Sequence, residues 1–123
     1  MKTASRSADR APKESAALAM AREVLEIEAK AISDLIGKLD QRFTQAVELI
    51  LNCRGRVVVS GIGKSGHIAR KIASTLASTG TPAFFVHPAE ASHGDLGMVT
   101  REDMMIALSN SGESEELLAI IPL

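Results

Sequence analysis

Apolar residues recur every three or four positions between residues 14 and 52, a spacing typical of amphipathic helices. Gly37 and Asp40, a candidate N-cap, predict that this stretch divides into two helices, one ending near Gly37 and one beginning near Asp40. The apolar positions that form the stripe include Leu18, Leu25, Ile32, Leu39, Phe43 and Ile50. Such a stripe serves core packing and a subunit interface equally well, so both alternatives stay open.

After residue 52, short continuous apolar runs alternate with helical stretches. The runs Arg56 to Ser60, Ala83 to Val86 and Met104 to Ser109 predict strands. Residues 64–79 and 113–123 predict helices, the second interrupted by Pro122, and a loop fills the interval between the second and third strands. This alternation predicts an α/β fold in which helices cover both faces of a parallel sheet, with ligands at the carboxyl ends of the strands.

The expected organisation is a disordered polar tail over residues 1–13, N-terminal helices over 14–52 and an α/β domain over 53–123. Doubly wound sheets usually have about five or six strands. We therefore expect a sheet of about three strands to be incomplete and the chain to be a fragment or a truncated product.

Composition excludes several classes of protein. The net charge is -1 and aromatic residues make up 2% of the 123 residues, which argues against a nucleic-acid partner. No apolar run approaches the roughly 18 residues of a membrane span, and the N-terminus lacks the apolar core of a signal peptide. The one cysteine, Cys53, allows no internal disulfide, so a reducing, cytoplasmic location is expected.

Two small-residue loops follow predicted strands. The first, Gly61-Ile-Gly-Lys-Ser-Gly66, fits the dinucleotide fingerprint, but Val58 stands where a nucleoside-triphosphatase loop needs its first glycine. The second, Ser109-Asn-Ser-Gly-Glu-Ser-Glu-Glu116, repeats the same chemistry after the third strand. Each is expected to present free backbone N–H groups and serine hydroxyls at a helix N-terminus, which together suggest one shared phosphate. The alternative for the first loop is a purely structural glycine turn.

Several charged and imidazole side chains accompany these loops. Lys64 is expected to direct a cation at a phosphate or a developing oxyanion, and Glu116 a carboxylate at sugar carbons. Glu113 and Glu115 are expected to offset the dipole of the last helix. His87 and His93 could polarise a sugar oxygen or move a proton, or could merely anchor their loop, and they do not define a structural zinc site. His67 is interpreted as a packing or surface residue.

A series of short segments between residues 61 and 116 resembles the sugar isomerase (SIS) domain family and, within it, the arabinose 5-phosphate isomerases. These segments are Gly-Lys-Ser-Gly-His at 63–67, Ser-Thr-Gly-Thr-Pro at 78–82, His-Pro at 87–88, His-Gly-Asp-Leu-Gly-Met at 93–98 and Ser-Asn-Ser-Gly-Glu-Ser at 109–114. The serine loop alone marks only the superfamily, whereas the His-Pro and His-Gly-Asp segments are narrower.

The resemblance implies a three-layer parallel sheet sandwich and a cofactor-free interconversion of D-ribulose 5-phosphate and D-arabinose 5-phosphate, which serves synthesis of the eight-carbon acid of lipopolysaccharide. It implies catalytic roles for Lys64 and Glu116, an inhibitory metal contact at His87, and a homo-oligomer, a tetramer in full-length members. The implied substrate-binding residues are Gly63, Ser65, Gly80, Thr81, His87, His93, Ser109, Asn110, Ser111, Ser114 and Ala119.

Family members continue with a further catalytic glutamate and histidine and with paired CBS domains, which do not occur in this sequence. The hypothesis is therefore that the parent protein is the isomerase and that the chain alone is inactive. The main alternative is a non-catalytic sugar-phosphate-binding module of the same fold, and a third is a Rossmann oxidoreductase supported only by Gly61, Gly63, Gly66 and Glu90.

Overall fold

The computed structural model describes residues 15–121, so the expected tail over residues 1–13 and the interruption at Pro122 lie outside the described residues. The chain divides into two compact units, with the boundary between Asp40 and Gln41. The first unit holds the helix α1 (Ala16–Asp34) and the short 3-10 helix η1 (Ile36–Lys38). Ser15 caps α1 by accepting a hydrogen bond from the Leu18 amide at 3.2 Å. The predicted helix ending near Gly37 is thus confirmed.

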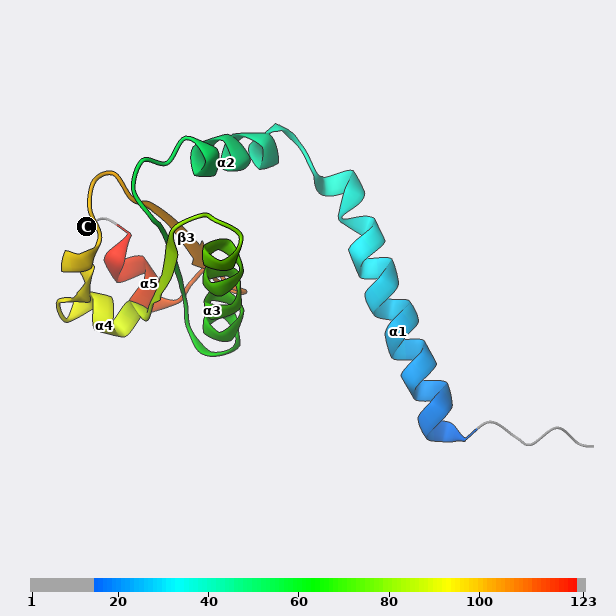
Figure 1. Ribbon diagram of the computed structural model, residues 1–123. Helices are drawn as coiled ribbons and strands as arrows, with labels where there is room; N and C mark the ends of the chain where they lie inside the picture. Colours follow the sequence, from blue (N-terminus) through cyan, green and yellow to red (C-terminus); the bar gives the residue numbers. More distant parts are fainter. Residues whose placement is uncertain (1–14, 122–123) are drawn as a thin grey trace, which may run out of the picture. The chain divides into compact units, whose positions relative to one another are not determined.

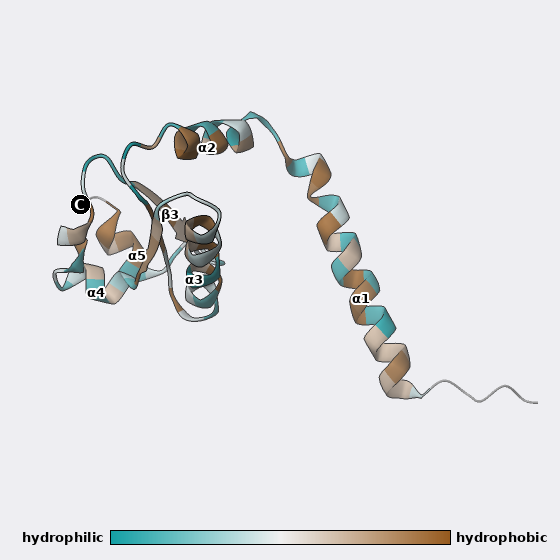
Figure 2. Ribbon diagram, viewed as in Figure 1, coloured by the Kyte–Doolittle hydropathy of each residue, from teal (hydrophilic) through white to brown (hydrophobic). Residues whose placement is uncertain are grey.

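No residue of α1 is buried, although apolar side chains line it. Figure 2 shows these apolar positions recurring along the helix among polar ones. On the polar side of α1, Lys30 and Asp34 lie one turn apart and form an exposed ion pair at 2.7 Å, which stabilises the helix. Because packing of an apolar face supplies most of the stability of a protein helix, α1 has a face suited to a partner.

The second unit begins with α2 (Gln41–Leu51) and continues as an alternation of strands and helices. The elements that follow are β1 (Val57–Gly61), α3 (Gly63–Ser78), β2 (Ala83–Val86), α4 (Pro88–Ser92), the 3-10 helix η2 (Asp95–Met98), β3 (Met104–Leu108) and α5 (Glu115–Ile120). The three predicted strands are confirmed. The interval between β2 and β3, predicted as a loop, instead contains α4 and η2, because Pro88 at the first helical position and the His87 side chain start a short helix there.

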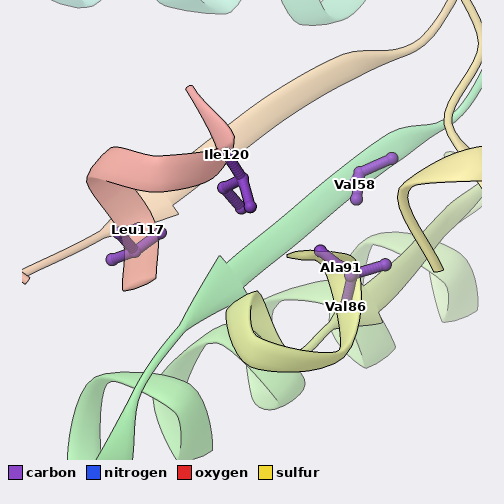
Figure 3. Packing of buried hydrophobic residues seen from close by; sticks show 5 residues of the cluster. All are labelled: Val58, Val86, Ala91, Leu117 and Ile120. Carbon is purple, nitrogen blue, oxygen red and sulfur yellow. The ribbon is translucent and has the colours of Figure 1, made fainter. Parts of the chain in front are cut away.

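The sheet has the strand order β2-β1-β3, and β1 pairs in parallel with both neighbours. All five residues of β1 are buried. The two faces carry separate apolar clusters. On one face Val57 and Val59 pack with Ala69 and Ala73 of α3. On the other face Val58 packs with side chains of β2, α4 and α5, as Figure 3 shows.

The layers follow from these clusters: α3 covers one face of the sheet, and α4 and α5 cover the other (Figure 1). The alternation of valines in β1 places Val58 opposite Val57 and Val59, so one continuous apolar run supplies both cores. The predicted three-layer α/β arrangement is confirmed.

Asp103 ties the sheet together at the edge where the strands begin. Its carboxylate accepts hydrogen bonds from the Arg56 amide at 2.6 Å and the Thr100 amide at 2.8 Å, and the Arg56 guanidinium lies at 3.5 Å. A side chain on Gly55 would collide with this carboxylate, so the close approach requires glycine at that position. The amino ends of β1 and β3 are therefore fixed by one buried acid.

Candidate functional site

The predicted binding loops leave the sheet at one edge. Gly61 pairs with Leu108 and Ser60 with Val86, so the three strands end nearly level, and the segments 61–66, 87–88 and 109–114 all begin there. The connection from β1 to β2 runs through α3 on one face, and that from β2 to β3 through α4 and η2 on the other. In open α/β sheets, such a reversal is the place where ligands bind, between the ends of the strands. Here the two small-residue loops follow the strands on either side of it, β1 and β3.

The first loop brings the start of α3 directly against the end of β1. A Cβ on Gly66 would lie 2.7 Å from the Gly61 carbonyl oxygen, and a Cβ on Gly61 would lie 3.0 Å from the Ser65 carbonyl carbon. Gly63 has a φ of 58°, which favours glycine. Ile62 gives α3 no side-chain cap, so its side chain satisfies none of the first N–H groups of the helix, and Lys64 in the first turn is exposed.

The serines of the second loop hold its own backbone. The Gly112 amide donates to Ser109 Oγ at 2.9 Å, and the Glu113 amide donates to Ser111 Oγ at 3.1 Å. Ser114 Oγ lies 3.3 Å from Ser109 Oγ. The expectation of free loop amides is therefore wrong for these two amides, because serine hydroxyls a few residues away already accept from them. The hydroxyl hydrogen of Ser111, and that of whichever of Ser109 and Ser114 accepts in their contact, remain able to donate to an anion.

Helix α5 begins at Glu115, two residues later than the predicted start at residue 113. Ser114 is the N-cap and Glu115 and Glu116 occupy the first turn, whereas Glu113 precedes the cap. Of the predicted dipole partners, Glu115 lies in the first turn and Glu113 does not. Glu116 is exposed in that turn, directly after the serine loop, and Ala119 is exposed on the same helix.

A cavity of about 240 Å³ opens beside the first loop, on the side of β2. Its lining residues are Gly61, Gly63, Gly66, His67, Arg70, Phe85 and His87. It brings His87 beside the glycine loop, whereas no residue of the serine loop lines it, so the shared phosphate predicted for the two loops stays a prediction. It also includes His67, interpreted from the sequence as a packing or surface residue, and Arg70 and Phe85, which the sequence analysis missed. The available signal was spacing, since Arg70 lies one helical turn after Gly66.

His87 has a defined role at the end of β2. It is half-buried, and its Nδ1 accepts a hydrogen bond from the Ala89 amide at 3.2 Å, which caps α4. An imidazole nitrogen that accepts from an N–H carries no proton, so the neutral ring carries its hydrogen on Nε2. His87 therefore presents a hydrogen-bond donor.

With this geometry established, the comparisons with known proteins decide the family. The sequence model of the SIS domain matches residues 50–123, more than half of the chain. The chain belongs to the SIS domain family. Among solved structures, the c3406 protein of E. coli CFT073 in complex with arabinose 5-phosphate superposes on this SIS domain chain with a TM-score of 0.79 at 48% identity, covering 84% of this chain and 55% of that one.

Curated relatives carry a more specific name. Arabinose 5-phosphate isomerase KdsD of Salmonella typhi is 61% identical over 101 residues, 82% of this chain and 31% of the relative. The protein of the same name from Pseudomonas aeruginosa is 54% identical over 103 residues, 84% of this chain and 32% of the relative. The chain thus spans about a third of the length of these relatives.

Within this SIS domain, not every predicted substrate residue lies at the loop edge. Gly80, which has a φ of 99°, and Thr81 follow α3 and precede β2, so they lie at the opposite edge of the sheet. Strand β2 spans four residues, which separates the two edges by about 13 Å at the usual rise per residue. His93 is exposed at the C-cap of α4. Substrate contact by these three residues stays a prediction.

Residues 15–121 contain no cluster of three or more His, Cys, Asp or Glu side chains placed to hold a metal ion. A metal at His87 stays a prediction, and binding through Nε2 would require the ring to exchange tautomers and give up the cap on α4. Over the same residues, no helix is long and apolar enough to cross a membrane.

Proposed function

We propose that this SIS domain is the phosphosugar-binding part of an aldose-ketose isomerase that interconverts D-ribulose 5-phosphate and D-arabinose 5-phosphate. The observation that carries the proposal is the convergence of the Lys64 loop, His87 and the serine loop at the carboxyl ends of three adjacent strands. Relatives at 54 and 61% identity bear the name of that enzyme, and a similar structure was solved with arabinose 5-phosphate.

The phosphate of the substrate would lie between the ends of β1 and β3. Hydroxyl donors of the serine loop, the Asn110 amide and the first-turn N–H groups of α5 would then contact it, because the loop follows β3 directly and leads into α5. Helix α3 begins on the other side of that position, where Ser65 is half-buried. The two helix N-termini thus offer the electrostatic setting that an anionic ligand needs.

The chemistry needs a base and a stabilised oxyanion. In the forward direction a base removes a proton from C1 of the ketose, the C2 oxygen takes up negative charge, and the resulting enediol accepts a proton at C2 as the C1 hydroxyl becomes the aldehyde. We propose that Glu116 is the base that moves the proton between C1 and C2, and that Lys64 stabilises the oxyanion. The two residues lie in the first turns of the helices that follow β3 and β1. No oxidant or cofactor enters this sequence of steps.

The test is conversion of ribulose 5-phosphate followed by carbon NMR, for the chain and for the chain extended through the rest of its reading frame. We expect the chain to bind the substrate and turnover to need the extension. In the extended protein, Glu116→Gln should lower kcat by about a thousandfold while ribulose 5-phosphate affinity changes little. Glu115→Gln, one residue earlier on α5, is the matched control.

Saturable binding with turnover in neither protein would favour the non-catalytic module. Full activity of Glu116→Gln would contradict the assigned base.

We also propose that the protein works in the cytoplasm, in support of lipopolysaccharide synthesis, and as a homo-oligomer. The lone Cys53, the relatives named above and the apolar face of α1 support these three points.

A further inference from the structure

The cavity beside β2 is lined by polar side chains that donate hydrogen bonds. Arg70 has no acceptor atom, the neutral His87 presents Nε2–H, and His67 adds a second imidazole. The rest of the lining is glycine backbone and the Phe85 ring, so no carboxylate of the described residues lines the cavity. Such a lining is suited to a ligand rich in oxygen acceptors.

Arg70 stacks on an aromatic ring and has no hydrogen-bond acceptor among residues 15–121. Its guanidinium carbon lies 4.0 Å from the centroid of the Phe85 ring. Among residues 15–121, no carboxylate or carbonyl accepts a hydrogen bond from this guanidinium. The stacking therefore orients the donors of Arg70 without using them.

A second arginine shows what a purely structural pairing looks like in this fold. Arg56 stacks over Phe84 at 4.5 Å, and its Nη2 donates to the Met98 carbonyl at 2.6 Å and lies 3.5 Å from Asp103. Arg56 is thus engaged by protein acceptors at the edge where the strands begin. Arg70 makes the same ring contact at the edge where ligands bind, and within the described part of the chain its donors are not engaged.

We propose that Arg70, with His67 and the Nε2–H of His87, binds the oxygens of the sugar at the end away from the phosphate. This inference rests on the proposed function. In that function the phosphate lies between the ends of β1 and β3, and the cavity lies on the other side of β1, about one strand spacing of 4.8 Å farther along the sheet edge. A five-carbon sugar phosphate is long enough to reach from one to the other. The carbonyl and hydroxyl oxygens near the reacting carbons would then meet a guanidinium and an imidazole donor.

The test compares Arg70→Met with Lys71→Met in the intact chain. Each variant removes one positive charge from an exposed residue of α3, so long-range attraction of an anion falls similarly in both, but only Arg70 lines the cavity. Titration calorimetry measures binding of ribulose 5-phosphate and of inorganic phosphate. Arg70→Met should weaken sugar phosphate binding by about tenfold or more relative to Lys71→Met and leave inorganic phosphate binding within about twofold.

Labelled arginine provides a second readout that needs no variant. The Nε–H signal of Arg70 should shift on addition of arabinose 5-phosphate and stay in place with inorganic phosphate. Equal effects of the two methionine variants on sugar phosphate binding would overturn this inference but not the proposed function. If Arg70→Met weakened binding of inorganic phosphate as much as binding of the sugar phosphate, the cavity would be a phosphate site, and the inference would again be overturned. Failure of the unaltered chain to bind either pentose phosphate would contradict the proposed function as well.

Discussion

Single atoms decide how close α3 can come to β1. The Gly61 carbonyl oxygen occupies the space that a side chain on Gly66 would need, so the binding loop and the packing of the helix depend on the same residue. The fingerprint Gly-x-Gly-x-x-Gly predicts this contact from spacing alone. Spacing also places Arg70 one turn after Gly66, but it does not predict that the guanidinium has no acceptor among residues 15–121, because an arginine on a helix is usually solvated.

Gly66→Ala is predicted to destabilise the SIS domain by about 1–3 kcal/mol, because the new methyl group would force α3 away from β1. Gly97→Ala is the matched control, since nothing lies within 4 Å of a Cβ at that position. Urea unfolding of both variants measures the difference. Equal midpoints would show that the strand end and the helix adjust without cost.

Asp103 is predicted to make stability depend on pH in acid. The amide donors of Thr100 and then of Arg56 lower the pKa of Asp103 from its ordinary value of 3.8. A depressed carboxyl pKa contributes stability that is fully present above the ordinary value and is lost as the pH falls through the lowered pKa. Thermal melts of the parent chain should therefore shift downwards below about pH 4.

Asp103→Asn should be less stable than the parent at neutral pH and should show a smaller decline in acid, because the side chain can no longer lose a negative charge. Asp95→Asn is the control, as Asp95 is exposed in η2. An Asp103→Asn variant with the parent's full acid dependence would assign that dependence to other carboxyl groups.

At the scale of elements, each strand and the division at Gly37 could be predicted because period and breaker residues are local signals. The helix α4 could not, because its five residues are too few for periodicity, and its start depends on the His87 ring accepting from a backbone amide. The strand order β2-β1-β3 could not be predicted from local sequence patterns either, because it depends on which face of the sheet each helix packs against. The placement of Gly80 and Thr81 at the opposite edge, by contrast, follows from chain order, since they precede β2.

The hydrogen bonds within the serine loop are predicted to hold it in the shape that binds phosphate. Ser109→Ala removes the acceptor for the Gly112 amide and the contact with Ser114, so the loop should no longer hold its shape. We expect sugar phosphate affinity to fall by about tenfold and the free energy of unfolding by less than about 1 kcal/mol, because the loop is exposed.

Ser78→Ala is the control for this loop, because Ser78 makes a comparable exposed hydrogen bond to Thr75 at the far end of α3. Calorimetric titration with arabinose 5-phosphate measures both variants. Unchanged affinity for Ser109→Ala would mean that the phosphate is bound elsewhere.

At the scale of the whole molecule, the apolar stripe of α1 is predicted to mediate self-association. Leu25 and Ile32, seven residues apart, are 65 and 69% exposed. Replacing both by glutamine should shift light scattering towards the monomer, because the substitution removes apolar area that only association would bury. The control is Glu26→Gln on the same helix. An assembly unaffected by the double substitution would place the interface on another surface.

The central claim is that a pentose phosphate binds across the carboxyl ends of β1, β2 and β3. The most direct measurement is a titration of the isotope-labelled chain with arabinose 5-phosphate, followed by amide NMR signals. We predict saturable shifts that are largest in residues 61–70, 85–88 and 109–117, with the Arg56 and Asp103 signals at the opposite edge unchanged. Absence of saturable shifts, or shifts centred on that opposite edge, would contradict the account.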